Sequence, residues 1–441
     1  MNRLKTFFSS SSIFWPYALI LLLIALRNPL PLVRAELWAE DATDFFVGGL
    51  TYGVKGLITP MAGYHFFIAR LIAYLASFFP VYYTPFIFSG SSWILDAWAM
   101  AYFSREGFSW IIPSRGQRIF VCAVLALGPG TAEVFLNFCN LSSALTWLFV
   151  LMLLERPHRL SISKLGTFIV LLFSAGQIFV FVPVVTALIW FTREKRYAWL
   201  LLAFVPVVFL NLITTTHVGT QAGWISYNRL ALEPKLLAEQ FIERLLLIPV
   251  LGLHISEVLM RSSDLIFWPV SLAYTVIFCR ILFWDAKRTA RIKTRDDVER
   301  LWLMLITFCC TLLILAVTLI VRTYSVRDLI RPTGVMWGHR YAFLPGCMAL
   351  VIWFTILFRA SPRGAAKIVV FSLIFVITGQ VLAVMNYRNY DERTDLHWSE
   401  QAEEIQKTID LKNRGRLTKP VTLSGIRAHP NLTFSMTIDP N

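Results

Sequence analysis

Residues 165–191 read LGTFIVLLFSAGQIFVFVPVVTALIWF, an apolar run without a charged side chain. A helix that crosses a bilayer needs about 20 apolar residues, each adding about 1.5 Å. This run is too long for one ordinary span, and Ser174-Ala175-Gly176-Gln177 interrupts its middle. The pattern therefore predicts a hairpin of two short membrane-spanning helices.

Other apolar runs recur along the chain and predict nine further spans. They are Ile13–Val33, Tyr83–Phe103, Ile119–Phe138, Leu141–Leu154, Ala198–Thr214, Asp264–Trp284, Leu301–Val321, His339–Phe358 and Lys367–Met385. Of the 441 residues 56% are hydrophobic and only 15% charged, too little charge to cover a soluble protein of this size. We expect an all-α polytopic membrane protein with about 11 transmembrane helices.

The net charge of +14 raises the question of nucleic-acid binding. The Lys and Arg residues lie in short clusters between apolar runs, however, as the positive-inside rule predicts for cytoplasmic loops of a membrane protein. Nucleic acid is therefore not an expected partner. The predicted inner loops are Asn2–Lys5, Ser104–Arg118, Arg156–Lys164, Thr192–Arg196, Asp285–Arg300 and Arg359–Lys367.

Consecutive spans cross the membrane in opposite directions. Placing these basic loops inside therefore puts the remaining loops outside the cytoplasm. They are Arg34–Phe79, Thr131–Asn140, Thr215–Ser263 and Arg322–Gly338, followed by a tail from Asn386 to Asn441. Two amphipathic stretches, Tyr64–Phe79 and Phe241–Ser256, are expected to lie on the outer surface as juxtamembrane helices. Residues 1–385 would form the transmembrane domain and 386–441 a small extracytoplasmic tail, with a helix at Ser399–Asp410 and a strand at Asn431–Ile438.

Four acids crowd the first outer loop, whose residues 35–46 read AELWAEDATDFF. Asp41 and Asp44 can share one face of a helix, whereas the adjacent Glu40 and Asp41 cannot. A carboxylate that is partly desolvated near lipid has a raised pKa and can serve as a general base. The alternative interpretation is a solvated loop whose acids cap a helix near Thr43.

A second stretch, residues 59–70, reads TPMAGYHFFIAR and carries His65 and Arg70. Pro60 and Gly63 break the chain before the predicted surface helix. Both basic side chains could contact a phosphate at the lipid boundary. Alternatively, the Arg70 side chain simply extends to the lipid headgroups.

A third stretch contains Arg322, Arg327 and Arg331 and continues as WGHRYAFLP over residues 337–345. Cations on the outer side oppose the positive-inside trend and so need an explanation. Arginine makes bidentate contacts to phosphate and keeps its charge where water is scarce. The stretch predicts a phosphate-binding role, and the alternative is pairing with headgroups or with Asp328.

Taken together, the acidic first outer loop, the segment 62–71 (AGYHFFIARL) and the segment 339–345 (HRYAFLP) resemble the GT-C glycosyltransferases, within a poorly characterised group of bacterial membrane proteins. The resemblance implies that Asp41, with Glu40 and Asp44 as alternatives, is the base acting on the acceptor. It leaves a divalent metal open where the donor is a diphosphate, and no metal ligand is assigned. The implied substrate-binding residues are His65, Tyr64, Arg70, Arg331, His339, Arg340 and Tyr341.

The function implied by this resemblance is transfer of a sugar from a polyprenyl-phosphate-linked donor to a glycan, lipid or protein acceptor, on the outer face of the inner membrane. One alternative is a transporter or flippase for lipid-linked sugars, ranked second because span centres carry few acids, with Asp96 and Glu133 as the main exceptions. Another is a polymerase or ligase of surface polysaccharide, which would share its substrates.

Overall fold

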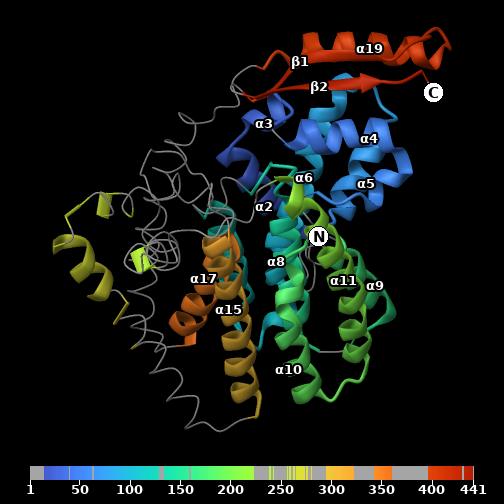
Figure 1. Ribbon diagram of the computed structural model, residues 1–441. Helices are drawn as coiled ribbons and strands as arrows, with labels where there is room; N and C mark the ends of the chain where they lie inside the picture. Colours follow the sequence, from blue (N-terminus) through green and yellow to red (C-terminus); the bar gives the residue numbers. More distant parts are fainter. Residues whose placement is uncertain are drawn as a thin grey trace, which may run out of the picture.

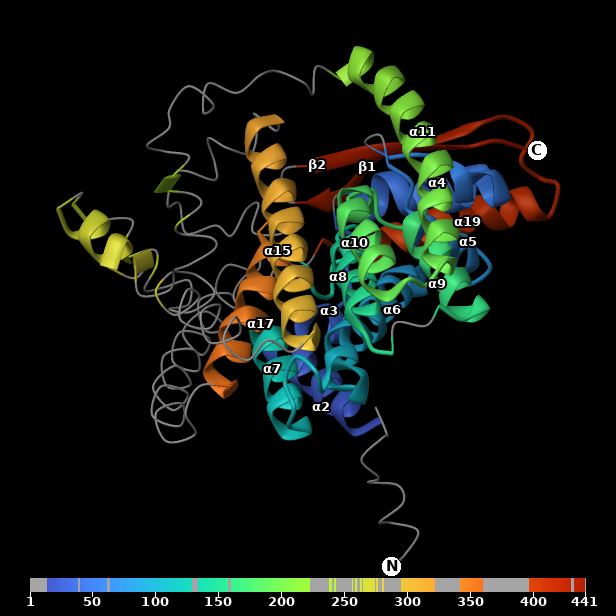
Figure 2. The same cartoon turned by 90° about the horizontal axis from the view of Figure 1, so that it is seen from below.

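The computed structural model describes residues 14–38, 40–61, 64–128, 134–157, 160–222, 295–321, 342–359, 396–429 and 432–440, with scattered positions between 238 and 280. This part of the chain is mostly helical (Figures 1 and 2). The longer helices are α2 (Phe14–Arg27), α5 (Phe67–Ala76), α6 (Thr84–Ala101), α7 (Arg115–Leu127), α8 (Leu141–Leu154), α9 (Ile162–Leu172), α10 (Val182–Thr192), α11 (Arg196–Ala222), α15 (Arg295–Val321), α17 (Phe343–Arg359) and α19 (Trp398–Asn413). Shorter turns are α3 (Leu30–Val33), η1 (Asp41–Phe46), α4 (Val47–Tyr52), η2 (Gly53–Ile58), η3 (Val81–Tyr83), η4 (Tyr102–Ser104), η5 (Glu106–Phe108) and η7 (Ile178–Phe181).

The expectation of eleven spans is not supported. Within the described ranges one helix, the Asp296–Val317 part of α15, is long and apolar enough to cross a membrane. Most of the other apolar helices have 10 to 17 residues. At about 1.5 Å per residue the shortest of these cover only half of a hydrocarbon core of about 30 Å. The predicted span 367–385 lies outside the described residues, as does part of 264–284.

Helix-breaking residues explain why the helices are shorter than the apolar runs. The first run divides into α2 and α3, because Pro29 lacks an N–H and ends the regular helix. The run predicted as Ile119–Phe138 is helical only as far as Leu127, where Gly128 follows. Residues 134–140 are not helical, although they are apolar. The predicted span overlaps the predicted outer loop Thr131–Asn140 here, and the structure agrees with the loop for the described residues 134–140.

The run 165–191 divides as predicted into two helices, α9 and α10, separated by a break that includes η7, but neither helix is long enough to be a candidate membrane span. The break falls at Phe173–Gln177, on the small and polar residues that suggested it. Its tip contacts the first outer loop, as described below.

Among the described residues, the predicted inner loops Ser104–Arg118 and Arg156–Lys164 and the end of Asp285–Arg300 lie close together. Glu155, which follows α8, forms ion pairs with Arg105 at 2.7 Å and with Lys164 at 3.3 Å. The neighbouring Arg156 pairs with Glu299 of α15 at 2.9 Å. Three segments far apart in sequence therefore share one charged cluster. This grouping is the one that the charge parity had predicted.

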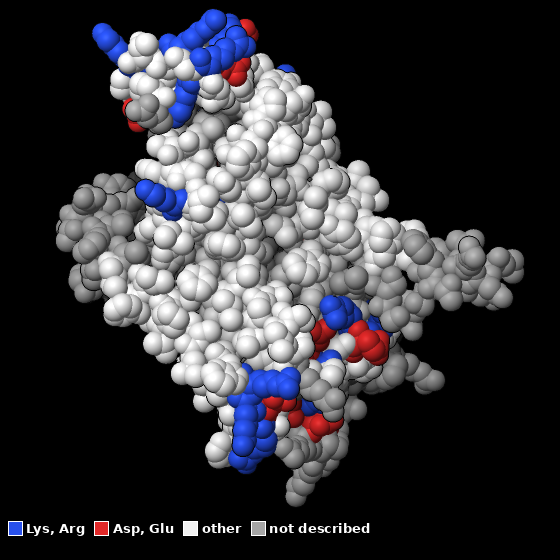
Figure 3. Space-filling model, turned by 90° about the vertical axis from the view of Figure 1, so that its right-hand side faces the viewer, with Lys and Arg blue, Asp and Glu red and all other residues white. Residues whose placement is uncertain are grey.

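Charged side chains avoid the middle of the molecule. Figure 3 shows Lys, Arg, Asp and Glu in groups near the upper and lower ends, with a broad band between them that is nearly free of charge. Large apolar side chains also point outward from α11, among them Trp199, Val205 and Phe209, each more than 60% exposed. A water-facing surface would not normally carry so many contiguous apolar groups.

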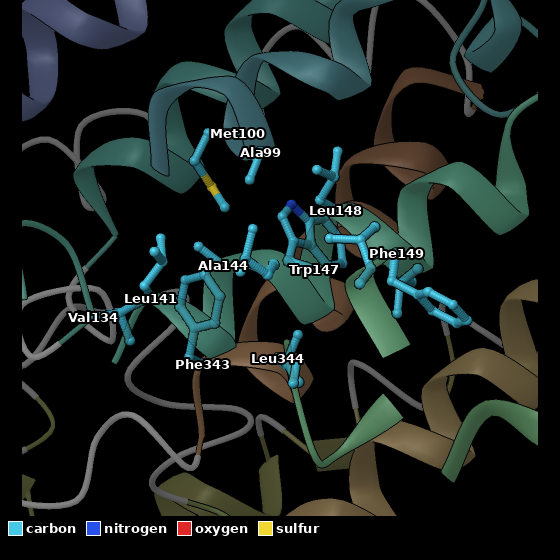
Figure 4. Close-up of a cluster of buried hydrophobic side chains, with 14 of the residues drawn as sticks. Ala99, Met100, Val134, Leu141, Ala144, Trp147, Leu148, Phe149, Phe343 and Leu344 are labelled. Atoms are coloured by element: carbon cyan, nitrogen blue, oxygen red, sulfur yellow. The ribbon is translucent and has the colours of Figure 1, made fainter. Parts of the chain in front are cut away.

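The centre of the bundle is packed with apolar side chains from α6, α8 and α17 (Figure 4). Trp147 of α8 is fully buried there, close to Met100 of α6 and Leu344 of α17. Because nearly every residue of α8 is buried, this helix forms the centre of the core. It fixes the position of the segment 134–140 that leads into it.

The tail forms a small separate layer, in which α19 packs on an antiparallel pair of strands, β1 (Val421–His429) and β2 (Leu432–Ile438). The predicted helix and the predicted second strand are confirmed, whereas β1 was not predicted. The side chain of Gln406 accepts a hydrogen bond from the backbone N–H of Val81 at 2.9 Å, and Trp398 contacts Phe46 edge-on. The tail therefore covers the first outer loop (Figure 1).

Candidate functional site

The acidic loop folds into η1, a π-helical turn that begins at Asp41. Such turns are rare and occur often at functional sites. Asp41 is only 5% exposed, and its Oδ1 accepts a hydrogen bond of 2.8 Å from the backbone N–H of Cys139. The carboxylate thus joins the first outer loop to the segment 134–140.

A second acid holds the same segment from the other side. Oδ2 of Asp96, a fully buried residue of α6, accepts a 3.0 Å hydrogen bond from the backbone N–H of Leu136. Buried backbone groups outside a helix need such partners, because leaving them unpaired is costly. Phe138 stacks on Phe88 with ring centroids 4.1 Å apart. Asp96 Oδ2 therefore helps to hold this segment, whereas its Oδ1 is buried without a hydrogen-bond partner among the described residues. Glu133 lies outside the described residues.

Asp44 differs from Asp41 because it is partly exposed. The hydroxyl of Thr43 donates to its Oδ2 at 2.9 Å, and the guanidinium of Arg70 donates to its backbone carbonyl oxygen. Burial raises the pKa of the Asp44 carboxyl, and the nearby charge of Glu40 raises it further. The Thr43 hydrogen bond and the charge of Arg70 act in the opposite direction. Asp44 therefore combines access to solvent with a raised pKa.

Arg70 of α5 is only 4% exposed, which contradicts the alternative in which its side chain extends to the headgroups. The guanidinium lies 5.1 Å from the ring centroid of Phe45, in cation–π contact. A Cβ atom at Gly48 would collide with its Nη1, so the glycine leaves the space that the arginine occupies. Burial lowers the pKa of Arg70, and the charge of Asp44 opposes this shift. The contact between Arg70 and Asp44 is the centre of the candidate site.

His65 lies beside this pair in sequence and is 7% exposed. Its Nε2 has no hydrogen-bond partner among the described residues. Burial lowers the pKa of the imidazole, and a hydrogen bond to the backbone of Ile58 opposes the shift. Burial thus favours the neutral form of the ring, and its Nε2 is left for another group.

The tip of the α9–α10 hairpin holds the segment that carries His65 and Arg70. The N–H of Phe67 donates to the carbonyl oxygen of Phe173 at 2.9 Å, and the N–H of Ile68 donates to Oγ of Ser174 at 3.2 Å. These bonds satisfy two of the N–H groups that the first turn of α5 leaves unpaired. The ring of Tyr64 lies where a Cβ atom at Gly176 would be. The sequence predicts the break at Ser174–Gln177, but it does not predict that the segment carrying His65 and Arg70 contacts this break.

The structure thus brings together Asp44 and Arg70 and places Glu40 close enough to influence Asp44. Asp41 and Tyr64 belong to the same outer loop and contact its neighbours instead. Asp41 bonds to Cys139, and the ring of Tyr64 lies against Gly176. The remaining predicted phosphate-binding residues, Arg331, His339, Arg340 and Tyr341, lie outside the described residues. In the part of the chain that the structure describes, no three His, Cys, Asp or Glu side chains gather into a group that could hold a metal ion.

Comparison with known proteins gives no independent identification of these features. No protein family, no curated protein and no solved structure matches this chain.

Proposed function

We propose that this chain is an integral membrane glycosyltransferase that takes its sugar from a polyprenyl-phosphate-linked donor. The observation that carries the proposal is the partly exposed Asp44, which has a raised pKa and is held by the buried Arg70. A partly exposed carboxyl with a raised pKa is suited to act as a general base.

The membrane location is supported by the nearly uncharged band (Figure 3) and by the outward-facing apolar side chains of α11. A bilayer would cover this band and leave the two charged ends in water. The candidate site lies at the end covered by the C-terminal tail. Under the charge parity of the loops, this end faces away from the cytoplasm.

In the proposed reaction the acceptor hydroxyl attacks the anomeric carbon of the donor. A bond forms between the acceptor oxygen and that carbon, while the bond between the carbon and the phosphate oxygen breaks. The leaving electron pair remains on the polyprenyl phosphate, and the hydroxyl proton passes to the carboxylate of Asp44. Arg70 acts as a positioning residue because its guanidinium holds the backbone of Asp44. Cations must stabilise the charge that develops on the phosphate.

Sequence reasoning favoured Asp41 as the base, whereas exposure favours Asp44. Asp41 is buried and holds the N–H of Cys139, so we assign it the task of positioning the loop. Asn at position 41 can still accept that hydrogen bond through its side-chain oxygen. The two acids can therefore be separated by experiment.

The test is transfer of radiolabelled sugar from polyprenyl-phosphate-linked hexoses and pentoses by membranes containing the full chain, with the change in cell-surface glycan composition as a second readout. Asp44→Asn should reduce transfer by about 100-fold or more, the usual contribution of a general base. Asp41→Asn should retain much more activity. Glu403→Gln, at an exposed ion pair on α19, is the matched control. Full transfer and unchanged glycans with Asp44→Asn would refute the proposal.

A further inference from the structure

An exposed group of aromatic side chains lies at the end of the first outer loop and in η3, just before α6. They are Phe78, Phe79, Tyr82 and Tyr83, which are 49–68% exposed. We name these four residues the aromatic patch. Tyrosine concentrates at the level of the lipid headgroups, because its ring prefers an apolar contact and its hydroxyl tolerates water. The two phenylalanines add apolar surface beside the two tyrosines.

The C-terminal tail lies directly beside the aromatic patch. Gln406 of α19 bonds to Val81, which lies between Phe79 and Tyr82. The helix ends seven residues later, at Asn413, about 10 Å further along at the usual helical rise. The end of α19 and the aromatic patch therefore lie near each other.

Cations dominate the end of α19 and the turn after it. Residues 412–419 read KNRGRLTK and contain no acid, and we name them the basic segment. Arg414, Arg416 and Lys419 are exposed, and none of the three forms an ion pair with any described residue. Cationic side chains gather at this end of the molecule in Figure 3. Unpaired cations on a surface that also offers aromatic rings favour an anionic partner with an apolar part.

We propose that the aromatic patch and the basic segment together bind the surface of a bilayer that contains anionic phospholipid. This inference rests on the membrane location given in the proposed function, and it adds a specific lipid chemistry and a task for the tail. The rings enter the headgroup region, and the basic segment contacts the lipid phosphates above it. Each Lys or Arg near an anionic surface adds to the attraction, which salt weakens. A soluble anionic glycan would satisfy the cations but would leave the rings uncovered.

The experiment is hydrogen exchange of the purified full chain in nanodiscs of phosphatidylcholine, with and without phosphatidylglycerol. We expect several-fold slower exchange of the backbone amides in the basic segment when phosphatidylglycerol is present. The triple substitution Arg414→Gln, Arg416→Gln and Lys419→Gln should remove this difference. Lys407→Gln, which alters a cation of α19 that is paired with Glu403, is the matched control and should retain it.

Exchange in β1 and β2 provides the check on folding, because their backbone hydrogen bonds should remain protected in every variant. The inference would be overturned if phosphatidylglycerol did not slow amide exchange in the basic segment of the wild type. It would also be overturned if phosphatidylglycerol slowed this exchange equally in the triple variant. Failure of the glycosyltransferase proposal can be distinguished from failure of the lipid-binding proposal. Asp44→Asn should leave the slower exchange with phosphatidylglycerol unchanged. A chain that does not enter nanodiscs would overturn both proposals.

Discussion

The ionisable groups at the two charged ends of the molecule differ in their hydrogen-bond partners. At the end formed by the predicted inner loops, Glu155 binds Tyr102, Arg105 and Lys164 together, each within 3.3 Å. At the other end, Nε of Arg70 and Nε2 of His65 are buried and have no hydrogen-bond partner among the described residues. The contacts of Glu155 satisfy its carboxylate and stabilise the fold, although the buried Tyr197 hydroxyl nearby has no hydrogen-bond partner among the described residues. At the other end, the two buried nitrogen atoms of Arg70 and His65 remain able to bind a further group.

Unsatisfied buried polar atoms are costly, so a protein normally avoids them unless a ligand or a reaction uses them. The type of an ionisable residue near a membrane surface therefore does not decide its role. Glu155 and Asp44 are both acids close to cations, and their surroundings decide which is structural. Substitutions at Glu155, Gly176 and Asp44 test this difference.

The largest effect on stability is expected from Glu155→Ala. It removes the shared acceptor of Tyr102, Arg105 and Lys164 and leaves partly buried donors unpaired. We expect a loss of about 3 kcal/mol in the free energy of unfolding. A lower Tm in mild detergent would report it, with sugar transfer reduced only in proportion to the folded fraction. A Tm equal to that of the wild type would show that this end is not held by its ion pairs.

A smaller loss is expected from Gly176→Ala at the tip of the α9–α10 hairpin. The new methyl group would overlap the ring of Tyr64, which must move together with its neighbour His65. Overpacking of this kind costs about 1–3 kcal/mol. Hydrogen exchange at Phe67 and Ile68 should become faster, since their hydrogen bonds to the hairpin tip would be disturbed.

The control for that substitution is Gly166→Ala in α9, where nothing lies within 4 Å of the added atom. In a helix interior Ala is favoured over Gly by about 0.5–1 kcal/mol, so this variant should be slightly stabilised. If both variants behaved alike, the contact between the hairpin tip and the outer loop would not constrain the site.

The smallest effect is the pH dependence of stability in Asp44→Asn. The pKa of Asp44 is raised in the folded protein, so folding is penalised once the unfolded state ionises, above the ordinary Asp value of about 3.9. The penalty grows as the pH rises through the folded pKa and is then constant. The Asn variant should therefore be at least as stable as the wild type at neutral pH, with no advantage below pH 4.

Chemical unfolding at a series of pH values would measure this difference. Asp439→Asn, which alters an exposed acid after β2, should show no comparable trend. Greater stability of the wild type at neutral pH would mean that Asp44 is a satisfied structural acid like Glu155, and the contrast between the two ends would fail.

The sequence alone predicted the helical class, the division of 165–191 into two helices, the helix and last strand of the tail, and the grouping of the described inner loops. These features follow from local signals. Apolar runs favour helices, Ser174 and Gly176 mark a break, and clustered Lys and Arg residues mark one side. The sequence also identified Asp44, His65 and Arg70 as candidates, because ionisable residues are unusual beside apolar runs.

Only the tertiary structure decided which of these residues meet and what each one does. Asp41 bonds to Cys139, Asp96 to Leu136 and Ile68 to Ser174, and each contact joins segments more than 35 residues apart. The helices also proved shorter than the apolar runs, since residues 134–140 remain buried without being helical. High hydrophobicity indicates that a segment is buried away from water, but it does not indicate the backbone conformation. Whether its backbone is satisfied by a helix or by a distant carboxylate depends on the packing of the whole chain.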